Sequence, residues 1–149
     1  MVKKTVALGA DHGGYALKEA VKQHLEETGY QCRDFGTDGA TAVDYPDMAV
    51  GPCEAVLAGE ADLALLFCGT GVGISMAANK IKGIRACCCS DVFSAKYTRI
   101  HNDANALCMG GRVVGPGLGC ELADAFLTAE FEGGRHQERI DKIMALEDR

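Results

Sequence analysis

The chain has 149 residues, which suits one domain with a sizeable hydrophobic core. Its net charge of −6 argues against nucleic acid or an anionic membrane as the main partner, but a small anion held by local arginines remains compatible with it. No apolar run approaches the ~20 residues that span a bilayer, and the apolar stretch after Lys3 and Lys4 is too short for a secretion signal, so we expect a cytoplasmic protein.

Short apolar runs of strand type alternate with segments of helical period along the chain. The first strand is expected over residues 5–9 and the first helix over 15–28, where Leu17, Val21 and Leu25 recur every four residues. Further strands are expected over residues 31–35, 63–68, 84–89 and 106–109. Further helices are expected over residues 44–58, 69–80, 91–101, 118–129 and 136–146. Buried strands that alternate with helices predict a single α/β domain over residues 1–149, a three-layer α/β/α Rossmann-like fold with a five-stranded parallel sheet.

The segments just after the strands are the places to look for a ligand. In open parallel sheets, ligands bind beyond the carboxyl ends of the strands. Here those segments are residues 11–12, 68–73, 90–91 and 110–112.

The segment from Gly69 to Gly73 has glycine at every second position. Such a loop can turn several backbone N–H groups toward one point at a helix start, which favours binding of an anion or an oxyanion. A dinucleotide fingerprint would need a third glycine where Ile74 stands, and the spacing and lysine of a Walker loop are missing. On spacing alone, a tight turn without a ligand fits equally well.

Three side chains near these segments can carry acid–base chemistry. Cys68 ends a strand in front of the glycine loop, where the positive end of the next helix would favour its thiolate. Asp11 follows the first strand together with His12, and His101 closes a predicted helix. Each has an ordinary structural alternative: a buried apolar cysteine, a helix cap and a cation at a helix end. As a set that we expect at one sheet edge, they favour a functional site.

The chain has eight cysteines, but their spacing is not that of a metal site. No C-x-x-C pair occurs, and a strand would point Cys88 away from Cys87 and Cys89. We therefore expect no metal. Apart from Cys68, we interpret most of the cysteines as small apolar core residues of a protein in a reducing compartment. The role of Cys89 is left open. These core cysteines are Cys32, Cys53, Cys87, Cys88, Cys108 and Cys120.

Arginines provide candidates for phosphate binding. Arg135 and Arg139 lie one turn apart on the last predicted helix, and Arg112 follows the fifth strand. Guanidinium groups bind phosphate through paired hydrogen bonds, although a solvated helix face is the common alternative for a terminal helix.

Together these segments resemble the family of ribose-5-phosphate isomerase type B and its relatives, the galactose-6-phosphate isomerase subunits. The resemblance covers nearly the whole chain, and its segments occur in the family's order. One branch of the family has a Glu where this chain has Ile74 and lacks the thiol, so the sequence resembles the Cys branch. The matching segments are residues 9–14, 44–46, 68–75, 77–80, 83–86, 101–105, 111–115 and 132–137.

The resemblance implies a metal-free and cofactor-free enzyme that interconverts ribose 5-phosphate and ribulose 5-phosphate. Cys68 would move a proton between C2 and C1, His101 would open the furanose ring, and Asp11 would shuttle a proton between the two oxygens. The Gly69–Gly73 backbone, with Thr70, would stabilise the enediolate. The remaining implied substrate contacts are His12, Tyr45, Gly69, Gly71, Val72, Gly73, Asn102, Arg112, Arg135 and Arg139, the three arginines holding the phosphate.

The chemistry agrees with these residue types, because a weakly acidic sugar C–H needs a placed base and stabilisation of the enediolate charge. The resemblance also implies at least a homodimer with a site completed between subunits. Three alternatives remain: an isomerase of a six-carbon 6-phosphate such as allose or galactose 6-phosphate, a non-catalytic phosphosugar-binding subunit, and a nucleotide-binding oxidoreductase. Ile74 counts against the last, and the combination of Cys68, Asp11 and His101 counts against the second.

Overall fold

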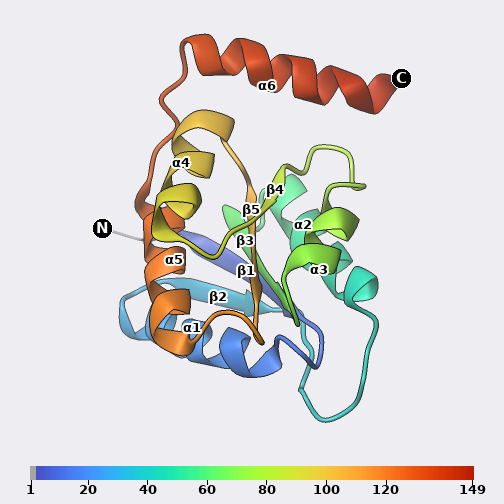
Figure 1. Cartoon of the computed structure of the whole chain (residues 1–149), viewed down its shortest axis with the longest axis vertical. Coiled ribbons are helices and arrows are strands. Elements are labelled where there is room, and N and C mark those ends of the chain that lie inside the picture. The colour runs from blue at the N-terminus through green and yellow to red at the C-terminus, as the bar shows by residue number, and fades with distance from the viewer. Residues whose placement is uncertain (1–2) are drawn as a thin grey trace.

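The computed structural model describes residues 3–149 and shows one parallel sheet with helices on both faces (Figure 1). The strands are β1 (Thr5–Ala10), β2 (Gln31–Asp34), β3 (Leu63–Cys68), β4 (Ala86–Cys88) and β5 (Ala106–Gly110). The helices are α1 (Tyr15–Glu27), α2 (Tyr45–Leu57), α3 (Val72–Ala78), α4 (Val92–Asn102), α5 (Pro116–Thr128) and α6 (Arg135–Ala145), followed by a 3-10 turn (Leu146–Asp148). The predicted fold class is confirmed; the first two residues of the predicted domain lie outside the described part.

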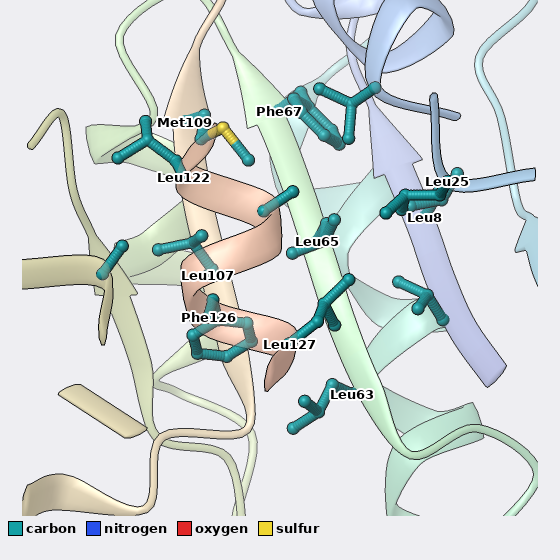
Figure 2. Packing of buried hydrophobic residues seen from close by; sticks show 14 of the residues in the cluster. Leu8, Leu25, Leu63, Leu65, Phe67, Leu107, Met109, Leu122, Phe126 and Leu127 are labelled. Carbon is teal, nitrogen blue, oxygen red and sulfur yellow. The ribbon is translucent and has the colours of Figure 1, made fainter. Parts of the chain in front are cut away.

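Alternate residues of β3 feed two separate cores, one on each face of the sheet. Leu63, Leu65 and Phe67 pack among residues of α1, α4 and α5. Figure 2 shows them with Leu25 of α1 and with Leu122, Phe126 and Leu127 of α5. Leu66 and Cys68 point to the other face, where small residues of α2 and α3 cover them. This period of two, with every residue of β3 buried, is what makes the strand a continuous apolar run in the sequence.

Helix α3 and the edge strand β4 depart most from the expectation, and α3 covers Val72–Ala78 instead of the predicted 69–80. β2 and β4 are partly exposed, because each pairs with a neighbour on one side only. β4 covers residues 86–88 instead of the predicted 84–89, because its single ladder with β5 begins at Ala86. α5 begins at Pro116, two residues before the prediction, since the fixed φ of proline suits the first turn of a helix.

The strand order β2-β1-β3-β5-β4 determines which loops meet. The chain leaves β1 toward β2 on one side and later returns to β3 on the other side, so a crevice forms beyond the carboxyl ends of β1 and β3. In the register, Ala10 lies beside Phe67 and Cys68 lies beside Gly110. The loops after β1, β3 and β5 therefore lie next to one another.

Helix α6 lies at the opposite end of the molecule from these loops, across the end of α4 (Figure 1). Among the helices of residues 3–149, none has both the length and the apolar character needed to cross a bilayer.

Candidate active site

Backbone hydrogen bonds join the three loops at the carboxyl edge of the sheet. The amide of Asp11 donates to the carbonyl of Phe67 over 3.1 Å, and the amides of Gly111 and Arg112 donate to the carbonyls of Cys68 and Gly69 over 2.8 and 3.0 Å. Side chains carried by these loops are thus held by the sheet rather than by mobile segments.

Cys68 lies at the centre of this edge, and its side chain is 4% exposed. Its sulfur accepts a hydrogen bond of 3.1 Å from the amide of Gly71. Gly71 has a φ of 82°, and a Cβ at this position would lie 2.8 Å from the carbonyl carbon of Met109, so only glycine fits here. The loop therefore aims an N–H dipole at the sulfur.

The glycine loop keeps several amides free. Besides the Gly71 amide bound to the Cys68 sulfur, the Val72 amide donates to Oγ1 of Thr70 over 3.2 Å. The amides of Gly69, Thr70 and Gly73 have no acceptor among residues 3–149. Of the backbone groups that the sequence proposed as oxyanion donors, these three remain available.

Asp11 and His12 occupy the neighbouring loop after β1. Oδ1 of Asp11, a buried side chain, accepts hydrogen bonds from the amides of Gly13 and Gly14 over 2.9 and 3.0 Å, so one oxygen supports the turn into α1. Asp11 is not the helix cap that was its structural alternative, because Gly14 is the N-cap of α1 and that helix has no side-chain cap. Oδ2 of Asp11 makes no hydrogen bond to the described chain. Nδ1 of His12 accepts a 3.3 Å bond from the amide of Val43, which leaves the ring proton on Nε2.

Tyr45 and Arg112 complete this half of the site. Tyr45 is the first residue of α2, and its ring lies against the backbone of Gly73: a Cβ there would be 2.6 Å from Cε1 of the ring. The Arg112 guanidinium lies against the backbone of Gly69 in the same way: a Cβ at Gly69 would be 3.3 Å from Nη1. Among the described residues, Arg112 forms no ion pair.

The remaining predicted site residues form a second group at the other edge of the sheet. His101 and Asn102 end α4, and Arg135 and Arg139 lie on α6. The ring of His101 stacks on that of His136, with centroids 4.2 Å apart and planes 12° from parallel. Nη1 of Arg139 donates to the carbonyl of Arg135 over 3.1 Å, and neither guanidinium pairs with a carboxylate in residues 3–149.

The two groups do not meet within one chain, which corrects the expectation of a single sheet edge. His101 precedes the amino end of β5, whereas Cys68 lies beside Gly110 at its carboxyl end. The strand between them rises roughly 13 Å over its length, at about 3.3 Å per residue. Helix α4 runs back along the sheet, so its last turn reaches the amino edge (Figure 1). We call the two groups the thiol half-site (Asp11, His12, Tyr45, residues 68–73, Arg112) and the histidine half-site (His101, Asn102, Arg135, Arg139).

The histidine half-site contains a cluster that the sequence analysis missed. His101, Glu132 and His136 offer ligand atoms within 4.8 Å of one another, and Nε2 of His136 is buried without a hydrogen-bond partner. Two rings this close to parallel cannot both direct an in-plane nitrogen at one ion about 2.0–2.1 Å away. The arrangement therefore suits ring stacking better than metal binding. Burial, with the nearby His101 and Arg135, lowers the pKa of His136 and so favours its neutral form.

A cavity of about 300 Å³ opens beside this half-site. It is lined by Cys87, Phe93, Ser94, Tyr97, Thr98, His101 and Asn102. Phe93, Tyr97 and His101 follow one another at intervals of four residues, and their rings are in contact along α4. That spacing was a visible signal in the sequence, whereas the stacking of His136 depends on where α6 docks.

The cysteines agree only in part with the expectation of core residues. All eight are free thiols; Cys53 and Cys108 are buried, and so is Cys89, whose role was open. Cys32, Cys87 and Cys120 are half-buried against the core. Cys88 is exposed, which contradicts the prediction: it ends the edge strand β4 beside the glycine loop, and its thiol lies 3.6 Å from the carbonyl oxygen of Thr70.

Comparison with known proteins connects this arrangement to one family. The family model described as Ribose/Galactose Isomerase matches residues 6–143. Ribose-5-phosphate isomerase B of Escherichia coli is 49% identical over 146 residues, 98% of each chain. The structure of Clostridium thermocellum ribose-5-phosphate isomerase B matches with a TM-score of 0.95 and 49% identity over 97% of both chains.

A further solved structure carries a ligand. Ribose-5-phosphate isomerase B from Mycoplasma genitalium, with bound ribulose-5-phosphate, matches with a TM-score of 0.91 and 39% identity over 97% of both chains. The agreement extends over both half-sites, since the family model covers every residue assigned to them. With this sheet order and a match over nearly its whole length, the chain belongs to the ribose/galactose isomerase family.

Proposed function

We propose that this protein is an aldose–ketose isomerase that interconverts D-ribose 5-phosphate and D-ribulose 5-phosphate through an enediolate. The observation that carries the proposal is the sulfur of Cys68, held at the carboxyl edge of the sheet by the Gly71 amide and faced by a loop with free N–H groups. The named isomerases among the relatives, one of them with ribulose-5-phosphate bound, support the same substrate.

The thiol half-site supplies a base and an oxyanion site next to each other. As a thiolate, Cys68 removes the proton from C2 and returns it to C1, because both carbons of the planar enediolate lie within reach of one base. Charge develops on the sugar oxygens in this step, and the free amides of Gly69, Thr70 and Gly73 stabilise it without a metal. The free Oδ2 of Asp11 moves the proton between the two oxygens.

The histidine half-site supplies the ring-opening group and two phosphate ligands. His101 passes a proton during opening of the furanose ring, and Asn102 contacts the open chain. Arg135 and Arg139 hold the phosphate together with Arg112 and His12, whose Nε2–H is free to donate. Tyr45 closes the side of the glycine loop against which its ring lies.

We infer that the two half-sites come from different subunits. The site is incomplete within one chain, because the groups lie at opposite edges of the sheet and a rigid five-stranded sheet separates them. A twofold homodimer places the histidine half-site of each subunit over the thiol half-site of the other and so creates two equivalent sites. The proposed enzyme is thus at least a homodimer.

A six-carbon 6-phosphate is the second candidate substrate, since the matched family is described by both ribose and galactose. One additional carbon changes the required depth of the pocket but not the chemistry at C1 and C2. We place the enzyme in the cytoplasm, where eight free cysteines are the expected state.

The test is an isomerase assay on ribose 5-phosphate, allose 6-phosphate and galactose 6-phosphate with wild type and Cys68→Ala. We expect the highest kcat/KM for the five-carbon substrate and loss of nearly all activity in the variant. Cys120→Ala is the matched control, because this half-buried cysteine lies on α5 away from both half-sites. Cys88 is a poorer control because of its contact with Thr70. Retention of most of the wild-type kcat by folded Cys68→Ala would show that the base is another group.

A further inference from the structure

The run Cys87-Cys88-Cys89 has no part in the proposed isomerisation. It forms the end of β4 and the residue after it. The strand turns Cys88 toward the glycine loop on one face, while the sulfurs of Cys87 and Cys89 come together on the other face at 3.3 Å. Two thiols in contact on one strand face are the starting geometry for a reversible disulfide.

We propose that Cys87 and Cys89 form a redox-active dithiol that hydrogen peroxide or an organic hydroperoxide converts into an intramolecular disulfide. Cys87 is the attacking thiol and Cys89 the resolving one. This assignment follows from their positions: Cys87 is half-buried and lines the cavity beside the histidine half-site, whereas Cys89 is 4% exposed and lies in the core.

Access favours Cys87 from two sides. It lines the 300 Å³ cavity shared with His101 and Asn102 and also a larger cavity of about 710 Å³ between α6, the 3-10 turn and the segment before β4. A small oxidant that enters either cavity meets this sulfur, whereas the buried Cys53 and Cys108 line neither.

The ionisation of the pair agrees with these roles. Contact with the Cys89 thiol and the Thr98 hydroxyl, against burial and the charge of Asp91, lowers the pKa of Cys87 to about 6. The same contact, with burial, raises the pKa of Cys89. The contact therefore favours the thiolate on Cys87, the form that reacts with peroxides.

The reaction balances with one peroxide per dithiol. The Cys87 thiolate attacks a peroxide oxygen, the O–O bond breaks, and Cys87 becomes a sulfenic acid while the leaving oxygen takes up a proton to form water or an alcohol. The Cys89 sulfur then attacks Cys87, and the expelled hydroxide takes the Cys89 proton to form a second water. Two thiols supply the two electrons that reduce the peroxide.

The strand can accommodate the bond. The sulfurs must approach from 3.3 Å to about 2.05 Å, which requires a small displacement of the backbone between them. β4 has only three residues and pairs on one side with β5, and on its other side only Ala86 is held, by the side chain of Asn79. The disulfide withdraws Cys87 from Thr98, which lies one turn before Asn102 on α4.

Tryptic mapping of the full-length protein tests the proposal directly. Cleavage after Arg85 and Lys96 releases one peptide that contains these three cysteines and no other. After one equivalent of hydrogen peroxide and alkylation of the remaining thiols, we expect this peptide to carry a single alkyl group, on Cys88, and to lack two hydrogen atoms. Dithiothreitol before alkylation should restore three alkylated cysteines.

Matched variants make the assignment specific. Cys88→Ala should still form the disulfide, whereas Cys87→Ala and Cys89→Ala should not, and Cys89→Ala should accumulate a sulfenic acid on Cys87 that dimedone traps. A disulfide that involves Cys88, a bond to Cys68, or a peptide whose three thiols remain alkylatable after peroxide treatment would each overturn the proposal. Because the readout is a mass and not a rate, it is independent of the proposed isomerase activity.

Discussion

At the scale of single residues, the cysteines differ in what surrounds each sulfur. Burial raises the pKa of Cys53 to about 11 and that of Cys108 well above its ordinary value, so both are thiols at any physiological pH. Cys68 is also buried, but its sulfur accepts the Gly71 amide. The backbone of the glycine loop, more than the cysteine itself, makes this position suitable for a base.

The proposed phosphate ligands Arg135 and Arg139 are predicted to act on substrate capture. In Arg135→Ala with Arg139→Ala, we expect KM for ribose 5-phosphate to rise at least ten- to a hundredfold, since a hydrogen bond to a charged group contributes about 1.5–3 kcal/mol. The phosphate keeps its charge during the reaction, so kcat should change much less than KM.

Lys142→Ala is the control for this helix, because Lys142 is an exposed cation in the last turn of α6. Its KM should stay within about twofold of wild type, as for a solvated charge. If the double arginine variant behaved in the same way, with an intact helix by circular dichroism, these guanidinium groups would have no role in phosphate binding.

The stacked histidines predict an enzyme that works without a metal ion. Dialysis against a chelator should leave the rate unchanged, since the nearly parallel rings of His101 and His136 do not converge on an ion. The measurement is the initial rate before and after dialysis, with addition of Zn²⁺, Mn²⁺ and Mg²⁺ as control. A rate that falls on dialysis and returns with one of these ions would refute metal independence.

At the scale of elements, a buried lysine joins α1 to β2. The Lys18 side chain is 1% exposed, and its Nζ contacts both oxygens of Asp34 at 2.9 Å and the carbonyl of Thr37 at 2.9 Å. A buried ammonium needs such partners, because desolvation without them would be costly. The contact fixes α1 against the edge strand and so holds the start of α1 next to the thiol half-site.

This contact predicts a loss of stability in acid. Burial opposes ionisation of Asp34, but hydrogen bonds from Lys18 and the Gly36 amide outweigh it and lower the pKa of Asp34 below its ordinary value of 3.8. A lowered folded-state pKa stabilises the fold fully above the ordinary value, and this contribution disappears as the pH falls through the folded-state pKa. The free energy of unfolding should therefore decrease below about pH 4.

Denaturant unfolding of wild type and Asp34→Asn at several pH values checks this predicted loss of stability in acid. We expect the difference in unfolding free energy between the two to be largest near neutral pH and to shrink below pH 4. Glu19→Gln serves as the control, because Glu19 lies 3.4 Å from the same ammonium but is 43% exposed and should have a small effect. A difference for Asp34→Asn that did not change with pH would mean that this carboxylate does not titrate as described.

The sequence predicted the central elements better than the edges. β3 and β5 are buried on both faces, so their apolar runs coincide with the strands almost to the residue. β4 has one partner strand and an exposed outer side, and the apolar run that predicted it begins two residues too early. Nor does the sequence show that Lys18 is buried, because its partner Asp34 comes from another element.

At the scale of the whole molecule, residue types and spacing were enough to nominate both half-sites, but not to place them. The loops that follow β1, β3 and β5 meet at one edge by a general rule for parallel sheets, and the structure confirms it. His101 ends a helix that runs back to the opposite edge, and α6 docks there as well. Which surface of a second chain would cover these groups in the proposed dimer depends on side chains spread over several elements, which no local pattern contains.

The central claim is that each active site combines the thiol half-site of one subunit with the histidine half-site of another. A hybrid of one Cys68→Ala chain and one His101→Ala chain, co-expressed with different affinity tags and purified through both, tests it. Each parent homodimer should be nearly inactive, because both of its sites carry a defect. The hybrid should recover about half of the wild-type kcat, since one of its two sites is intact.

A hybrid of Cys68→Ala and Asp11→Asn chains is the matched control. Both changes lie in the thiol half-site, so neither of the hybrid's two sites is intact and we expect no recovery. Activity in the first hybrid and none in the second is the result predicted for a shared site. If the purified Cys68→Ala/His101→Ala hybrid were as inactive as its parents, the two half-sites would not work together across a subunit interface.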